Sequence, residues 1–518
     1  MMSSTVSRPL SLERLLPGAV VLLNLLPLLL TPALPSIDFY AHIVRYNVLA
    51  HPDAFATHYQ PHWALLPNLG MDVLGTALML ALPPLVGAKV LAAIVITAPV
   101  LGCMALSRAL NGRVEPIAAL LAGLLGYNLI LFWGFANFLL GFGIALGSLG
   151  WWISRADRPR LQLAVMVPVG ILVLFIHGLV FALWGLLLGA AELGLALQAG
   201  RLRPLDLARR AGRLLLLAVI PVLLFTQMQT AEGEGGATGA LQNLAGIAAE
   251  GGGSGLVLRL VEELLKRVDS VLRVVETSLG PWPDRAFGLV LWGLLGAALV
   301  RGRIGVDRRI WPAAALCFVL IGLMPPNLFG VGHLDERMPL LFLAVLVAGL
   351  SPRPVAGRGA ERGAGTDRPL MALFPLHLLL VVWALAQAGT VYRDFLAQSG
   401  KIDTGAMAAA AFPGETRARD ASRACKPLLY LLQLRNGTAV PTFANPTQQP
   451  LRLAGPLATA AGAQAAPGAP LATQLPALLG AGFDSVVACD PDTAPVPDGT
   501  RVAASGAGWA LYQNASKP

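Results

Sequence analysis

Charged residues are scarce in this chain of 518 residues, where Asp, Glu, Lys and Arg together make up 13%. Soluble domains carry about 25%. Hydrophobic residues reach 55%, and long apolar runs recur between Pro17 and Trp383. Because one spanning helix needs about 20 apolar residues, this composition excludes a soluble globular protein and predicts a chain made mostly of membrane spans.

Nucleotide-binding and hydrolase motifs are also missing. The sequence contains no P-loop, Rossmann fingerprint, HExxH or GxSxG pattern, which argues against ATP-driven work and soluble-cofactor redox chemistry. The net charge is +9, yet the basic residues lie in short loops between apolar runs, and no basic aromatic platform accompanies them. We therefore expect no nucleic-acid partner.

Cysteine is rare, with four residues in the whole chain. Cys103 and Cys317 lie inside apolar runs and are expected to be inert core residues. Cys425 and Cys489 lie in the more polar tail and could pair if the tail is outside the reducing cytosol. No CxxC or Cys/His metal spacing is present, so the cysteines predict no metal centre.

The apolar runs predict an all-α polytopic membrane protein with about eleven transmembrane helices, occupying residues 1–391. The first run is long and lacks a small-residue cleavage site, so we interpret it as a span rather than a signal peptide. Pro83 and Pro84 interrupt the apolar residues 73–87, which predicts a helix at the membrane interface. The predicted spans are 17–35, 88–108, 115–133, 138–154, 161–176, 178–199, 212–228, 286–300, 310–325, 338–350 and 369–391.

Basic residues indicate the orientation of these spans. Arginines gather in every second connecting segment, whereas the segments between them hold few basic residues. The positive-inside rule places the arginine-rich segments in the cytoplasm. We therefore expect an inner-membrane protein whose N-terminus is cytoplasmic and whose C-terminus is extracytoplasmic. The arginine-rich segments hold Arg8 and Arg14; Arg108 and Arg113; Arg155, Arg158 and Arg160; Arg201, Arg203, Arg209, Arg210 and Arg213; Arg301, Arg303, Arg308 and Arg309; and Arg353, Arg358, Arg362 and Arg368.

Two outer segments differ from the spans in composition. The long outer loop, 229–285, begins rich in glycine and continues as GLVLRLVEELLKRVDSVLRVVE, whose apolar residues follow one helical stripe. Such an amphipathic helix could gate a lateral entrance from the membrane or stay packed over the bundle. Residues 392–518 are more polar, and a short helix, a buried strand at 483–490 and a C-terminal hairpin predict a small α/β extracytoplasmic domain.

The first outer loop, 36–72, holds the strongest candidates for chemistry. Asp38, His42 and Arg45 follow the first span at i, i+4 and i+7, which is one face if the helix continues. A carboxylate can act as general base for a hydroxyl, and a guanidinium can bind phosphate. His42 would orient the carboxylate or hold a metal. The alternative is a solvated helix end with an ion pair.

A divalent-metal site is a further hypothesis for this loop. His58, His62 and Asp72 supply ligand types, but Pro61 argues against a regular helix around the histidines. Any metal site would therefore be built from loop residues, and a simple polar loop is the alternative.

Two more outer turns carry unusual residues. GFANFLLGFG (134–143) combines aromatics with glycines and is typical of a tight helix-packing corner. GHLDER places His333 and Arg337 at the start of the tenth predicted span. Arg337 would either bind a phosphate or pair with Asp335 or Glu336, and the sequence favours neither.

SIDFYAHIVRYNVL (36–49), followed by HWALLPNLGMD (62–72), resembles the first outer loop of the GT-C superfamily of membrane glycosyltransferases, in particular its bacterial GT-C-like proteins. FWGFANFLLGFGIAL, GHLDERMPLLFLAVL and FANPTQQPL resemble further stretches of that group. The resemblance implies many spans, an acidic catalytic residue after the first span, and a polyprenyl-phosphate-linked sugar as donor. Asp38 matches the catalytic carboxylate, although many members carry two adjacent acidic residues where this chain has one.

The sequence thus predicts a membrane glycosyltransferase that transfers a sugar from a polyprenyl-phosphate-linked donor to an acceptor on the outer face. Asp38 would activate the acceptor hydroxyl, Arg45 and Arg337 would hold the donor phosphate, and His42 and His333 would support them. Membrane lipid is the expected environment. A transporter or lipid flippase is an alternative that would need internal repeats and charges near the midplane. A non-catalytic membrane scaffold is another, because only one aspartate follows the first span.

Overall fold

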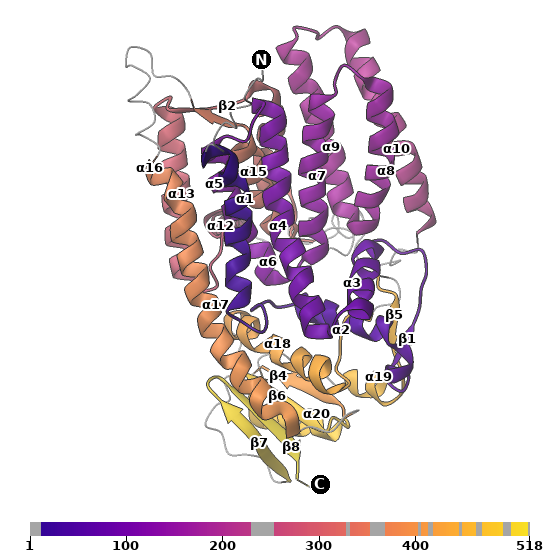
Figure 1. Ribbon diagram of the computed structural model, residues 1–518. Coiled ribbons are helices and arrows are strands. Elements are labelled where there is room, and N and C mark those ends of the chain that lie inside the picture. Colours follow the sequence, from indigo (N-terminus) through magenta and orange to yellow (C-terminus); the bar gives the residue numbers. More distant parts are fainter. Residues whose placement is uncertain are drawn as a thin grey trace, which may run out of the picture.

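The computed structural model describes residues 12–228, 253–327, 332–352, 368–401, 406–412, 418–444, 448–462, 469–489 and 499–515. Long helices stand side by side in a bundle, and a smaller tail domain lies under one end of it (Figure 1). The first half of the bundle contains α1 (Leu12–Leu25), η1 (Leu26–Leu29), α2 (Phe39–Ala50), η2 (Pro52–Phe55), β1 (Tyr59–Pro61), α3 (Leu69–Ala81), α4 (Pro84–Asn111), α5 (Pro116–Gly123), η3 (Leu124–Gly126), α6 (Leu129–Trp133), α7 (Ala136–Ser154), α8 (Pro159–Ile176), α9 (Gly178–Gln198) and α10 (Pro204–Gln227). The second half contains α12 (Gly253–Leu272), α13 (Pro281–Val300), β2 (Ile304–Val306), η4 (Arg308–Ile310), α14 (Trp311–Leu323), α15 (Leu334–Ala348), β3 (Leu350–Pro352), α16 (Arg368–Met371) and α17 (Leu373–Gln398).

Each predicted span coincides with helical structure. Six of the described helical segments are long and apolar enough to cross a membrane, namely α4, α7, α8, α9, α13 and the continuous stretch of α16 and α17. The others are shorter or interrupted, as where α5 gives way to η3 and then α6. The molecule is therefore a mostly helical protein with several membrane-spanning candidates, and the count of eleven stays a prediction.

Proline and glycine set the helix boundaries near the outer end. The helix α3 ends at Ala81, Leu82 is extended, and α4 begins at Pro84. The predicted break at Pro83 and Pro84 is confirmed, because proline restricts the preceding residue to extended backbone and is tolerated in a first helical turn. Gly134 has φ +96° between α6 and α7, a left-handed conformation that favours glycine.

Glycines also allow the close packing of α4 against α7. A Cβ added at Gly102 would lie 2.2 Å from the carbonyl oxygen of Gly143, and one added at Gly143 would lie 2.3 Å from the backbone of Ala98. Backbone atoms cannot move aside as a flexible side chain can, so this interface requires glycine at both positions. The packing role predicted for the 134–143 stretch is confirmed.

The tail domain is built on a four-stranded sheet of order β4-β6-β8-β7. The strands β4 and β6 are parallel, and the other neighbouring pairs are antiparallel. The predicted helix, buried strand and hairpin correspond to α20, β6 and the β7–β8 pair. The tail elements are η6 (Ser399–Lys401), β4 (Ala408–Ala411), α18 (Ala418–Asn436), β5 (Leu451–Leu453), α19 (Gly455–Ala461), α20 (Leu471–Gly480), β6 (Ser485–Cys489), β7 (Thr500–Gly506) and β8 (Trp509–Asn514).

The first outer loop is joined to this tail domain. The strand β1 pairs antiparallel with β5, with Tyr59 opposite Leu453. The Tyr59 hydroxyl donates to the carbonyl of Val440 at 2.7 Å and accepts from the Val440 amide at 2.8 Å. The helix α17 runs through the predicted domain boundary at residue 392 and ends at Gln398. The tail therefore covers the end of the bundle that carries the first loop.

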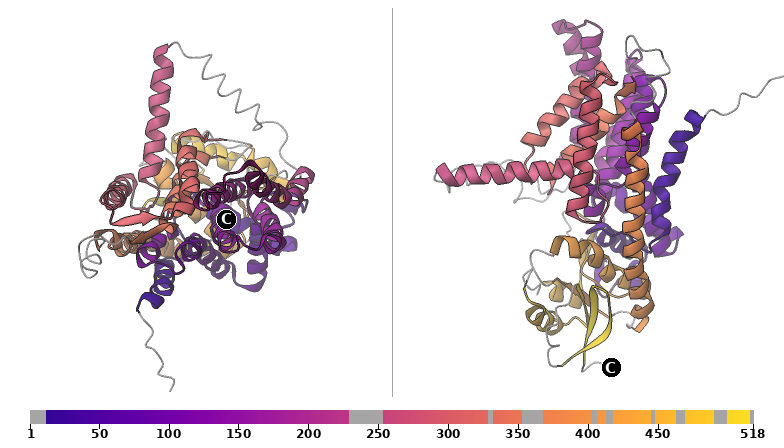
Figure 2. Two further views of the ribbon diagram at one scale, coloured as in Figure 1. Left: turned by 90° about the horizontal axis from the view of Figure 1, so that it is seen from above. Right: turned by 90° about the vertical axis from the view of Figure 1, so that its left-hand side faces the viewer.

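The amphipathic helix of the long outer loop is present as α12. It projects sideways from the bundle (Figure 2). Its Val261, Leu264, Leu265 and Val268 are all exposed, so the part of α12 that carries them is not covered by the bundle. The hypothesis that this helix is permanently packed is wrong for those residues, whereas gating stays a hypothesis. Residues 229–252 of the same loop lie outside the described part of the chain.

Candidate functional site

The chain entering the first outer loop is attached to the corner between α6 and α7. The Ile37 amide donates to the carbonyl of Phe132 at 3.0 Å, and the Asp38 amide donates to the carbonyl of Trp133 at 3.1 Å. A Cβ at Gly134 would lie 2.4 Å from the Phe39 nitrogen. This close backbone approach fixes Asp38 as the N-cap residue of α2.

Asp38 forms an ion pair with a residue of the tail domain. Its Oδ1 lies 3.0 Å from Nζ of Lys426, which belongs to α18. The Asp38 side chain keeps 18% of its surface exposed and that of Lys426 keeps 27%, so the pair is accessible from outside. Burial alone would lower the pKa of Lys426, but Tyr430 and Asp38 outweigh that effect and raise it. The pair therefore presents a carboxylate and a stable positive charge side by side.

His42 lies one turn after Asp38 on α2. Its ring packs 4.7 Å from that of Phe443, and its Nδ1 has no hydrogen-bond partner among the described residues. Burial lowers the pKa of His42 well below its usual value, and the positive charges of Arg45 and Lys426 lower it further. His42 is thus a neutral imidazole at physiological pH, and its buried Nδ1 is left unsatisfied by the described residues.

The Arg45 guanidinium forms an ion pair with Asp72, a partner that the sequence did not predict. Its Nε donates to Oδ1 of Asp72 at 2.6 Å, and both side chains are 2% exposed. Burial raises the pKa of Asp72, although Arg45 opposes the rise. The i, i+7 spacing put Arg45 on the expected helix, but a buried carboxylate from α3 occupies its guanidinium. Arg45 therefore takes part in the packing between α2 and α3 through Nε, its Nη1 has no hydrogen-bond partner among the described residues, and the phosphate-binding role stays a prediction.

The structure does not assemble the predicted metal ligands. Among the described residues no group of three or more His, Cys, Asp or Glu side chains is placed to hold a metal. Asp72 is occupied by Arg45, and Nε2 of His62 lies 3.2 Å from Arg452. His58 precedes β1, and its carbonyl accepts from the Ala454 amide at 2.8 Å. His58, through its backbone, and His62, through its side chain, therefore contact the tail, whereas Asp72 contacts α2.

His333 and Glu336 lie beside Trp133, the residue that accepts from the Asp38 amide. The Trp133 ring is 4.1 Å from that of His333, and its Nε1 donates to Glu336 at 2.6 Å. His333 Nδ1 lies 3.1 Å from the same carboxylate. Trp133 therefore connects Asp38, through its backbone, with the polar start of α15, through its side chain.

Arg337 lies deeper, on aromatic rings of the same corner. Its guanidinium carbon is 4.2 Å from the ring centre of Phe135 and 5.1 Å from that of Phe138. It donates to the carbonyl of Gly332 at 3.0 Å and lies 3.3 Å from His177 Nε2. Within the described residues it forms no direct ion pair with Asp335 or Glu336, although the Glu336 charge acts on it electrostatically.

The site thus differs in part from the one expected. Asp38 and His42 lie together as predicted, and His333 and Arg337 lie at the corner that holds Asp38. No motif or spacing in the sequence indicates Lys426, which follows Cys425 in α18. Trp133 lies in a quoted stretch without a predicted role, and Glu336 has only the predicted role of a possible partner for Arg337. The arrangement offers a proton acceptor, two positive charges and aromatic surfaces at one outer corner.

Comparisons with known proteins add little to this geometry. No protein-family model matches the chain, and no curated protein matches it. Among solved structures, the chain is similar to the arabinofuranosyltransferase AftD from Mycobacteria, with 16% sequence identity and a TM-score of 0.42. The match covers 98% of this chain and 40% of that one, so the chain spans less than half the length of that enzyme.

Fold and site together define a class, that of helical membrane proteins with a charged corner completed by a tail domain. No particular family is shown for the chain.

Proposed function

We propose that this protein is a membrane glycosyltransferase of GT-C type, which transfers a sugar from a polyprenyl-phosphate-linked donor to an acceptor at the outer face. The supporting observation is the accessible Asp38–Lys426 pair, held at the end of the first span by the corner that also carries Arg337. Ionisable residues at membrane depth are costly and tend to be functional.

In the proposed reaction Asp38 is the general base. It takes the proton of the acceptor hydroxyl while the acceptor oxygen bonds to the anomeric carbon of the sugar. The bond between that carbon and the donor phosphate oxygen breaks, and polyprenyl phosphate leaves. Lys426 and Arg337 would stabilise the negative charge on the leaving phosphate. Neutral His42 would orient the acceptor, and His333 would support the aromatic wall.

Arg337 supports a phosphate ligand for a further reason. Its side chain is buried, and Nε has no hydrogen-bond partner among the described residues. A buried cation that forms no direct ion pair is costly, even with the Glu336 charge nearby, and a ligand that supplies negative charge lowers that cost. A donor phosphate would meet that requirement.

The test is sugar transfer by the reconstituted full chain. Proteoliposomes would receive polyprenyl-phosphate-linked sugar donors, and release of polyprenyl phosphate would be measured for wild type, Asp38→Asn and Lys426→Met. We expect Asp38→Asn to lower the rate by about 100-fold or more, the usual contribution of general base catalysis. An EDTA arm would show whether a divalent metal is required.

Asp53→Asn is the matched control, because Asp53 is an exposed acid of the same loop. Its rate should equal that of wild type. Unchanged transfer by Asp38→Asn, in protein of wild-type thermal stability, would contradict the proposal. It would favour a scaffold, for which the Asp38–Lys426 pair is a clamp between the first loop and the tail.

A further inference from the structure

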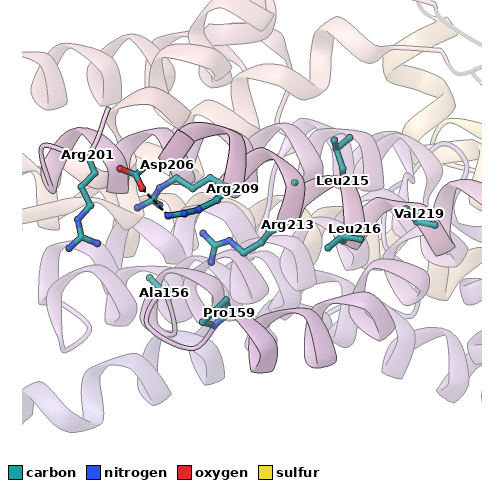
Figure 3. A pocket seen from close by; sticks show the side chains of 11 residues that line it. Ala156, Pro159, Arg201, Asp206, Arg209, Arg213, Leu215, Leu216 and Val219 are labelled. Carbon is teal, nitrogen blue, oxygen red and sulfur yellow. Dashed lines mark ion pairs between the residues drawn. The ribbon is translucent and has the colours of Figure 1, made fainter. Parts of the chain in front are cut away.

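A cavity of about 800 Å³ opens far from the candidate site, at the other end of the bundle. It lies between the start of α8 and a stretch that runs from Arg201, just before α10, to Val219 within that helix (Figure 3). Arg201, Asp206 and Arg209 line one end, and Leu215, Leu216 and Val219 line the other. The cavity therefore joins a charged end to an apolar end along a single helix.

The charged end is positive after internal pairing. Arg201, Arg209, Arg210 and Arg213 line the cavity. Among the described residues, two carboxylates form ion pairs with these arginines. Asp206 lies 3.8 Å from Arg209, and Glu192 pairs with Arg213. Four guanidinium groups facing two carboxylates leave two positive charges uncompensated, and Arg201 has no ion pair within the described residues.

Two of these arginines are held in place by a buried carboxylate. Glu192 on α9 is 3% exposed and forms an ion pair with Arg210 and, at 3.1 Å, with Arg213. Trp152 donates to the same carboxylate at 2.8 Å, and Gln162 accepts from Arg213 at 2.9 Å. Fixed guanidinium groups lose little conformational freedom when an anion binds, which favours a preformed anion site.

The apolar end lies on the outward face of α10. Leu215 is 70% exposed, Leu216 is 61% exposed, and exposed Val222 and Leu223 follow further along the helix. These side chains lead from the arginines toward the middle of the bundle. An anionic group at the arginines would thus be followed by a surface fit for hydrocarbon.

We propose that this cavity binds one anionic phospholipid from the membrane leaflet on the arginine-rich side. The phosphate lies between Arg201 and Arg209, close to the fixed Arg210 and Arg213, and an acyl chain follows Leu215, Leu216 and Val219. This side is the predicted cytoplasmic one, where anionic lipids concentrate and basic pockets between spans bind their head groups. The site is separate from the proposed sugar-transfer site.

The test is binding of defined lipids to the full-length protein in detergent. Phosphatidylglycerol with a fluorescent acyl chain would be titrated against wild type, Arg201→Ala/Arg209→Ala and a charge-matched control. The control is Arg108→Ala/Arg301→Ala, which removes two exposed arginines at the ends of α4 and α13. Both pairs lie outside the Glu192 network, so folding should survive; thermal unfolding of each variant checks this.

Three results are expected. Wild type binds phosphatidylglycerol about tenfold more tightly than phosphatidylcholine, Arg201→Ala/Arg209→Ala loses about tenfold in affinity, and the control keeps wild-type affinity. Equal affinity for the two lipids would overturn the proposal, as would equal losses in both double variants. Displacement of the labelled lipid by glycerol phosphate as readily as by unlabelled phosphatidylglycerol would also overturn it and indicate a soluble phosphorylated ligand.

Discussion

At the scale of single residues, local spacing identified the right helix but not the right partners. The side chains of Asp38, His42 and Arg45 share α2, as the i, i+4, i+7 pattern predicted. Lys426, however, is 388 positions from Asp38, and no periodicity in one chain connects residues so far apart. Arg45 was assigned to phosphate because nothing in the sequence indicates that Asp72 would be buried against it.

The buried Arg45–Asp72 pair should be costly to break on one side only. Asp72→Asn leaves an uncompensated guanidinium in a site that is 2% exposed, and we expect a loss of about 3–5 kcal/mol in unfolding free energy. Arg45→Met/Asp72→Leu removes both charges and should recover most of the loss. Denaturant unfolding of the detergent-solubilised variants measures this. A double variant no more stable than Asp72→Asn would contradict a charge-pair explanation.

His42 should make stability depend on pH. Its folded pKa lies well below the usual 6.5, so below that pH the unfolded chain binds a proton that the folded chain does not. Stability conferred by neutral His42 is therefore present above about pH 6.5 and lost as the pH falls, at up to about 1.4 kcal/mol per pH unit. His42→Phe should lose less stability between pH 7.5 and 5 than wild type does. Parallel stability curves for the two proteins would refute this assignment.

At the scale of elements, prediction worked best where one composition rule dominates. The apolar runs predict the helices, the two prolines predict the break before α4, and the amphipathic stripe predicts α12. The direction in which α12 projects depends on contacts of its C-terminal end, such as Arg267 donating to the carbonyl of Ile321 at 2.9 Å, and these are invisible in a helical pattern. Likewise α5, η3 and α6 were merged into one span because their composition is continuous.

The α4–α7 interface offers a test within one helix. In Gly143→Ala the new methyl would meet the Ala98 backbone at 2.3 Å, whereas in Gly147→Ala the nearest atom is 3.9 Å away. We expect the first change to cost about 1–3 kcal/mol and the second to be neutral or mildly stabilising. Thermal unfolding of both variants in the same detergent gives the comparison. Equal effects would show that the helices do not pack this closely.

At the scale of the whole molecule, the tail domain is fastened to the site that it completes. Cys425 and Cys489 form a disulfide between α18 and β6, which the sequence had left open. Cys425 directly precedes Lys426, so this bond fixes the turn of α18 that reaches Asp38. A disulfide is typical of an oxidising compartment, in agreement with the predicted extracytoplasmic tail.

Loss of this disulfide should therefore lower the stability of the tail and make the position of Lys426 beside Asp38 less fixed. Cys425→Ser/Cys489→Ser is expected to lower the unfolding free energy of the tail by about 2–5 kcal/mol and to reduce any activity that depends on Lys426. Limited proteolysis of the tail, with and without reductant, measures the first effect. Reductant should sensitise wild type and leave the double variant unchanged. Equal resistance of reduced and oxidised wild type would argue against a stabilising role.

The Asp38–Lys426 pair also has a consequence for biosynthesis. Asp38 enters the membrane region early in translation, whereas Lys426 emerges only after most of the bundle has been made. Until then β1 has no β5 to pair with, and the aspartate has no lysine. A chain that stops within the bundle would carry the first loop but no completed corner, so any activity at this corner would begin only once the tail has been made and has folded.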